Sequence, residues 1–274
     1  MRSGTVTDAV VLRVREDHRR RQADALATEE PMEIRGGGPG QEPVPVAVTM
    51  RTPGADFDLA AGFLLTEGLI GGSADVASIA YCDLPPEEQH YNVVTVRLTR
   101  PFEPPARPRG FVSSSSCGIC GKATLEDVEV RCAPLPSGLS VPRSVVAALP
   151  DALRASQRIF DRTGGLHATG VFDSSGDLVL VREDVGRHNA MDKVVGAALL
   201  AGRLPLTDRI AQVSGRLSFE IVQKAAVAGL PVVCAVSAPS SLAVRAAERL
   251  GVTLVGFVRD GGFNVYAHPE RIAW

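Results

Sequence analysis

The last third of the chain alternates short apolar runs with amphipathic segments, a pattern typical of a parallel β-sheet covered by helices. Three runs rich in β-branched residues predict strands at 210–213, 232–236 and 253–257. Between them, apolar residues recur at helical spacing over 218–228 and 242–250. Because parallel strands need such crossover connections, and because the links are short, we expect a right-handed strand–helix–strand–helix–strand unit.

A hairpin and two further helices are predicted upstream of that unit. Residues 168–172 and 178–181 are apolar and flank a Ser-Ser-Gly-Asp turn, as in a β-hairpin. Helical patterns cover 150–163 and 187–200.

The first hundred residues favour strands and contain many glycines and prolines. We expect strands at 9–14, 43–48 and 92–98. The second should lie at a sheet edge, because Pro43 and Pro45 cannot donate to a neighbouring strand. Residues 56–69 have one apolar helical face, which Asp56 can cap. The basic run Arg19–Arg21 is interpreted as a solvated loop.

A proline-rich stretch at 101–108 is the candidate linker between these two regions. We therefore expect a strand-rich N-terminal domain with one helix at 1–108 and a larger core at 109–274. The predicted fold class is α/β, a helix-covered mixed sheet with a smaller strand-rich N-terminal domain.

Composition narrows the class of protein. Of 274 residues, 45% are hydrophobic and 22% are charged, which excludes wholesale disorder. A net charge of −2 argues against a dedicated nucleic-acid binder. No apolar run approaches the roughly 18 residues of a membrane span, and the N-terminus has no secretory signal pattern. Five cysteines, an odd number, do not form a secreted disulfide framework. We expect a soluble, cytoplasmic protein that binds neither nucleic acid nor membrane.

One close cysteine pair, Cys117-Gly-Ile-Cys120, is the main candidate for chemistry. Zinc would need two more ligands at suitable spacing, and the other cysteines are isolated, so we expect no structural metal. The zinc-deaminase signature also fails, because Ser116 stands where proline should precede the first cysteine.

The surroundings of the pair favour thiol chemistry. Four serines and two glycines flank the cysteines and indicate an exposed segment. Lys122 and a helix beginning near Thr124 would stabilise a thiolate, the nucleophile of sulfur and disulfide exchange. The thiolate could accept the outer sulfur of a persulfide or pass an oxidising equivalent to a dithiol, and the spacing does not separate the two.

A second candidate site comes from the predicted parallel sheet. Ligands of open α/β sheets bind beyond the carboxyl ends of the strands, which here carry 214–216, 237–240 and 256–262. Hydroxyl and glycine residues at helix N-termini, together with two arginines, suit an anionic group such as phosphate. Phe257 or Phe263 could stack on a base. The alternative is that the serines are ordinary helix caps and the arginines are surface residues.

A dense polar cluster at 183–189 follows the hairpin, and His167 lies at its other end. The histidines at 167 and 188 fit a functional or a structural role equally well.

These segments, taken in order, resemble the FdhD (FdhD/NarQ) family of formate dehydrogenase accessory sulfurtransferases. The resemblance rests on RTPGADFDLAAGFLLTEGLI, SSSSCGICGKA, GGLHATG, REDVGRHNAMDKVVG, SGRLSFEIVQKAA, SAPSSLAV and GFVRDGGFNVY. It covers nearly all of the chain beyond about residue 40.

The resemblance implies a cytoplasmic, dimeric protein with a fold similar to cytidine deaminases. It implies that the protein takes sulfur from a cysteine desulfurase and delivers it to the molybdenum cofactor, as Mo-bis(molybdopterin guanine dinucleotide), for formate dehydrogenase. By this resemblance Cys117 carries the persulfide and Cys120 assists. A thiol–disulfide oxidoreductase and a non-enzymatic cofactor-holding chaperone are the alternatives.

The stretch GFVRDGGFN resembles the family's cofactor-nucleotide segment, with the flexible pair Gly261–Gly262 as a mild departure. Together with the sheet-edge residues, the expected cofactor-binding set is Ser214, Arg216, Ser237, Phe257, Val258, Arg259, Asp260, Gly261, Gly262 and Asn264.

Overall fold

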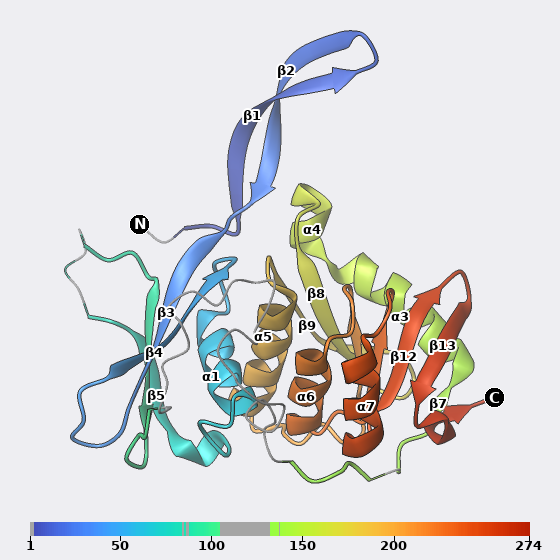
Figure 1. The fold of residues 1–274 in the computed structure, drawn as a ribbon. Coiled ribbons are helices and arrows are strands. Elements are labelled where there is room, and N and C mark those ends of the chain that lie inside the picture. The colour runs from blue at the N-terminus through green and yellow to red at the C-terminus, as the bar shows by residue number, and fades with distance from the viewer. Residues whose placement is uncertain (1–2, 84, 86–87, 105–131, 137) are drawn as a thin grey trace.

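The computed structural model describes residues 3–83, 85, 88–104, 132–136 and 138–274 (Figure 1). Its centre is a six-stranded sheet in the order β13-β12-β11-β10-β8-β9. The strands are β8 (His167–Phe172), β9 (Leu178–Asp184), β10 (Ile210–Val213), β11 (Val232–Ala235), β12 (Thr253–Arg259) and β13 (Gly262–Ala267). Strands β10, β11 and β12 are mutually parallel and the others pair antiparallel, so the sheet is mixed.

Helices cover both faces of this sheet because side chains alternate along each strand. On one face lie α5 (Arg187–Leu200), α6 (Phe219–Val227) and α7 (Ser241–Leu250), seen in front of the sheet in Figure 1. Ala211 and Val233 point into this layer. On the other face α3 (Arg143–Ser156) packs against Ile210 and Val232. Helix α4 (Arg158–Thr163) follows α3. The predicted helix-covered mixed sheet is confirmed.

The N-terminal region forms a second sheet, in the order β4-β3-β6-β5. Its strands are β3 (Glu30–Gly37), β4 (Val44–Arg51), β5 (Val76–Tyr81) and β6 (Val93–Leu98). Strand β4 lies at the edge, as its prolines predict. Helix α1 (Asp56–Thr66) packs this region against α5, and residues of both regions share one apolar core. The predicted boundary at residue 108 lies outside the described residues and stays a prediction.

Smaller elements complete the fold. Strands β1 (Val6–Arg15) and β2 (His18–Ala27) form a hairpin that projects from the body (Figure 1). Strands β7 (Val141–Pro142) and β14 (Ile272–Ala273) pair with each other, and the 3-10 turns are η1 (Ser73–Asp75) and η2 (Pro269–Arg271).

Three local predictions are wrong. The helix expected at 150–163 is two helices, and α3 continues through Pro150. An interior proline costs roughly 3 kcal/mol, but the buried stripe of Val146, Leu149 and Leu153 holds this helix against the sheet.

The other two errors concern polar residues. Ala55, not Asp56, occupies the N-cap position of α1, because the Asp56 carboxylate binds Arg51 and Tyr81 instead. The run Arg19–Arg21 belongs to β2, where pairing with β1 outweighs its polarity.

Candidate functional site

The cysteine pair lies outside the described residues. Cys117 and Cys120 belong to the segment 105–131, which is not among the described residues. Their roles stay predictions. The site that the structure does describe is the carboxyl edge of strands β10, β11 and β12.

The three loops predicted to meet at this edge do meet. The Phe257 N–H donates to the Ser237 carbonyl (3.2 Å), and the Leu217 N–H donates to the Ala238 carbonyl (3.2 Å). Gly256 permits the approach, because a Cβ there would lie 3.1 Å from the Ser237 carbonyl oxygen and from Pro239. Backbone hydrogen bonds therefore join the last part of β12 to the loop after β11, and that loop to the loop after β10.

The segment 257–262 forms the end of β12, a tight turn and the start of β13. Phe257, Asp260 and Gly261 have positive φ angles of 53°, 52° and 74°. The exposed Arg259 guanidinium lies 5.6 Å from the centre of the Phe257 ring. Val258 is fully buried in the core, so only its backbone can reach a ligand.

The remaining predicted binding residues also lie near this edge. They differ in how exposed their side chains are and in whether those side chains already form hydrogen bonds. Arg216 is exposed and Ser237 is half-buried. The Ser214 hydroxyl accepts from the Ala168 N–H (2.9 Å), which anchors the loop after β10 to β8. Exposed Asn264, on β13, donates to the Tyr266 hydroxyl (3.3 Å).

Two helices begin in these loops. Ser240 is an ordinary cap, because its hydroxyl accepts from the Ala243 N–H (3.2 Å) at the start of α7. Ser218 occupies the cap position of α6, but its hydroxyl lies 3.1 Å from Nε2 of His188 instead.

His167 and Arg187 reach the same edge. Strand β8 is antiparallel to β10, so its first residue, His167, lies beside the end of β10. His167 Nδ1 lies 3.5 Å from the Ser214 hydroxyl. A Cβ at Gly215 would contact His167 Nδ1 (3.4 Å) and Arg187 Cδ (3.6 Å), so both side chains border this glycine. Burial, followed by the charges of Arg187 and His188, lowers the pKa of His167.

His188 faces α6. Its Nε2 lies 3.7 Å from the Glu220 carboxylate, and their interaction lowers the pKa of Glu220 to about 2. A carboxylate with such a pKa is ionised at neutral pH, and here it provides the negative charge beside His188.

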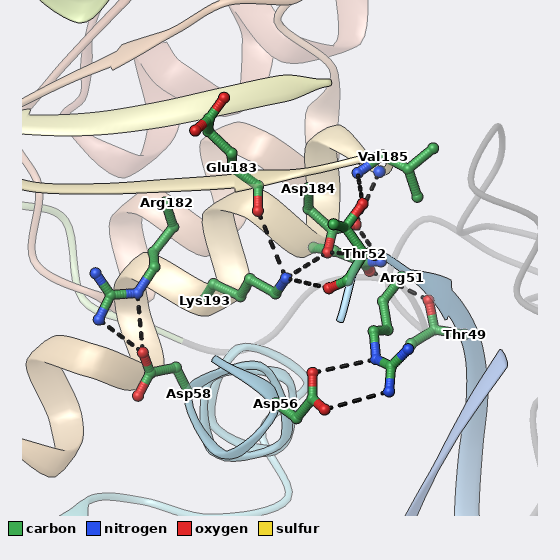
Figure 2. A network of polar contacts seen from close by, with 12 residues as sticks. Thr49, Arg51, Thr52, Asp56, Asp58, Arg182, Glu183, Asp184, Val185 and Lys193 are labelled. Carbon is green, nitrogen blue, oxygen red and sulfur yellow. Dashed lines mark hydrogen bonds and ion pairs between the residues drawn. The ribbon is translucent and has the colours of Figure 1, made fainter. Parts of the chain in front are cut away.

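A buried polar network holds the start of α5 in place (Figure 2). Lys193 Nζ lies 2.6 Å from the Asp184 carboxylate and donates to the Thr52 carbonyl (2.8 Å). Nearby, Arg182 pairs with Asp58 (2.8 Å). Lys193 and Asp184 are 1% and 0% exposed, so each charge depends on its partner. The network fixes the segment that carries Arg187 and His188.

Within the described ranges, no group of three or more His, Cys, Asp or Glu side chains could hold a metal ion. The expectation of no metal stays a prediction, because the cysteine pair lies outside those ranges. Among those same residues, no helix has the length and apolar character needed to cross a membrane.

Sequence reasoning marked the polar cluster at 183–189 and His167 separately but did not place them beside the predicted anion site. Their meeting depends on the antiparallel pairing of β8 with β10, which no local pattern specifies. The only available signal was the strand-to-helix position of the cluster.

Most of the chain is similar to known proteins. The model of the FdhD/NarQ family matches residues 27–273. The sulfur carrier protein FdhD of Mycolicibacterium paratuberculosis is 51% identical over 255 residues, covering 91% of this chain and 92% of that protein. The sulfur carrier protein FdhD of Streptomyces avermitilis is 49% identical over 278 residues, covering 98% and 97%. A crystal structure of a candidate formate dehydrogenase accessory protein from Desulfotalea psychrophila has a TM-score of 0.73 at 25% identity, covering 98% and 100%.

Proposed function

The chain belongs to the FdhD/NarQ family, and from that premise we propose that it carries sulfur as a persulfide on Cys117. The donor is a cysteine desulfurase, and the acceptor is the molybdenum cofactor, as Mo-bis(molybdopterin guanine dinucleotide), destined for formate dehydrogenase. The protein acts in the cytoplasm, as a homodimer.

Loading is a sulfur exchange without net oxidation. The Cys117 thiolate attacks the outer sulfur of the desulfurase persulfide, a new S–S bond forms, and the old S–S bond breaks. The desulfurase cysteine leaves as its thiolate, and the outer sulfur stays on Cys117. Lys122, five residues along the chain, favours the attacking thiolate by its charge.

The observation that carries the acceptor assignment is the joining of three loops at the carboxyl edge of β10, β11 and β12. Arg216 and Arg259, exposed at this edge, can pair with phosphates of the cofactor's nucleotide ends. Phe257 offers a ring to a base beside the Arg259 guanidinium. The molybdenum end of so long a molecule can reach Cys117 while its nucleotide end occupies the edge.

Maturation in cells tests this function. In cells lacking the native protein, we expect the wild-type chain to restore formate dehydrogenase activity and Cys117→Ala to restore none. Cys82→Ala is the matched control, because Cys82 is a half-exposed free cysteine outside the pair. Full restoration by Cys117→Ala would refute the persulfide assignment.

A further inference from the structure

Arg187 is a half-buried arginine whose charge has no partner among the described residues. Its Nε is buried without a hydrogen bond. By contrast, Arg51 and Arg182 each lie against a carboxylate, that of Asp56 and that of Asp58 (Figure 2). A buried unpaired donor on a cation is costly, and a bound ion is one of the explanations for such a group in a native protein.

The surroundings of Arg187 raise that cost. Burial first, and then the charges of Arg187 and His188, lower the pKa of His167, whereas Asp184 raises it. The nearby Asp184 carboxylate already binds Lys193 (2.6 Å), and Glu220 lies beside His188. Both carboxylates are therefore engaged by other cationic or imidazole side chains, and neither forms an ion pair with Arg187 in the part of the chain that the structure describes.

The two side chains converge on one point of the backbone. Both lie within 3.6 Å of the position that a Cβ would take at Gly215. Because this residue is glycine, no side chain occupies that position. Ser214, the preceding residue, brings a hydroxyl to 3.5 Å from His167 Nδ1.

We propose that Arg187 and His167, at Gly215, form an oxyanion subsite that takes a phosphoryl group. A guanidinium offers two parallel N–H donors to such a group, and an imidazole N–H adds a third. An anion there would supply the charge that Arg187 lacks, and its negative charge would favour the protonated form of His167. The subsite rests on the proposed function only for the source of the phosphoryl group, a nucleotide end of the cofactor.

The subsite is separate in sequence from the segment 257–262. It uses β8, α5 and the loop after β10, whereas Arg259 lies at the far end of β12, two strands away. The edge would then offer two separate places for phosphoryl groups.

Inorganic pyrophosphate tests the subsite without the cofactor. We expect calorimetry to show binding to the wild-type protein and a loss of tenfold or more in Arg187→Met, because hydrogen bonds to charged groups contribute roughly 1.5–3 kcal/mol. Arg209→Met is the matched control, since Arg209 pairs with exposed Asp208, and it should bind as the wild type does. The His167 ring resonances should shift on titration of the wild type and not of Arg187→Met.

Measurements of the melting temperature and of sulfur loading distinguish a misfolded variant, a wrong subsite and a wrong carrier function. Arg187→Met should melt at no lower temperature than the wild type, because it removes a buried unpaired donor. Arg187→Lys, which retains the charge but not the two-donor geometry, should bind with intermediate affinity. Absence of pyrophosphate binding to the wild type, or equal binding to Arg187→Met, would overturn the subsite. So would a loss caused by Arg259→Ala alone. Loading of Cys117 by a desulfurase is measured on the wild-type protein, where failed loading would refute the carrier function and leave pyrophosphate binding as the test of the subsite.

Discussion

Gly62 of α1 and Gly196 of α5 lie against each other where the two helices cross, and neither position has room for a methyl group. A Cβ at Gly62 would lie 1.9 Å from the Asp192 carbonyl oxygen, and one at Gly196 would lie 1.8 Å from the Asp58 carbonyl oxygen. The backbones therefore touch, and this contact joins the N-terminal region to the core that carries the candidate site.

Substitution of Gly196 by alanine should destabilise the protein. Overpacking costs typically about 1–3 kcal/mol, and we expect the upper end here because the clash is with backbone, which cannot rotate away. Urea unfolding measures the change. Gly72→Ala is the matched control, because Gly72 has an extended φ of 175° and nothing within 4 Å of its added Cβ. Equal stability of the two variants would contradict the close helix crossing.

The buried pair of Lys224 and Asp192 gives a second prediction. Lys224 Nζ lies 2.9 Å from both carboxylate oxygens, and the two side chains are 5% and 2% exposed. Lys224→Met leaves the carboxylate buried without its partner, which should cost about 3–5 kcal/mol of unfolding free energy. Arg154→Met, which breaks an exposed pair with Asp161, should cost less than about 1 kcal/mol.

The cost of Lys224→Met should depend on pH. Burial raises the pKa of Asp192, while Lys224 opposes that rise, so the pKa rises further in the variant. When the pKa of a carboxyl is higher in the folded state than in the unfolded state, folding favours its protonated form. The loss of unfolding free energy caused by burying the carboxylate is therefore small below the unfolded-state pKa, and it grows as the pH rises towards the folded-state pKa. The stability gap to the wild type should be smaller at about pH 5 than at about pH 8. A gap that does not change would contradict the buried pair.

Much of the core could be predicted because local pattern and packing agree there. The bounds of β10 and α5 match their predicted ranges to the residue, since a β-branched run and a glycine before the helix mark them clearly. Helix α3 begins at Arg143 and not at the predicted residue 150, because the apolar stripe on its first turns is satisfied only by packing against the sheet. The second strand of the N-terminal hairpin has little apolar pattern and depends on its partner.

Only the part of the candidate site that follows from the parallel direction of β10, β11 and β12 could be predicted from the sequence. Parallel strands place their carboxyl ends together, so the loops at 214–216, 237–240 and 257–262 could be grouped in advance. The position of Arg187 beside His167 follows from the packing of α5 and the pairing of β8, both long-range. That relationship needed the structure.

A guanine nucleotide should bind at this edge. We expect calorimetry to detect GDP binding, with Arg259→Ala weakening it by about tenfold or more because a charged hydrogen bond to phosphate is lost. ATP is the competitor that tests base preference. The nucleotide assignment is wrong if GDP does not bind, or if ATP competes equally well and Arg259→Ala does not change the affinity. Either outcome would leave the proposal of sulfur transfer by Cys117 untouched.

The purified protein should contain no stoichiometric zinc, because a single cysteine pair lacks the further ligands of a structural site. Elemental analysis measures the metal directly. About one zinc per chain, lost in Cys117→Ala, would replace the sulfur-carrier account with a structural metal site.

The most direct test of sulfur carriage is intact mass measured after incubation with cysteine and a cysteine desulfurase, followed by peptide mapping of the added sulfur. The account predicts one reducible sulfur atom on Cys117, absent in Cys117→Ala and still formed in Cys120→Ala. The same added sulfur in Cys117→Ala, or no added sulfur in the wild type, would contradict it.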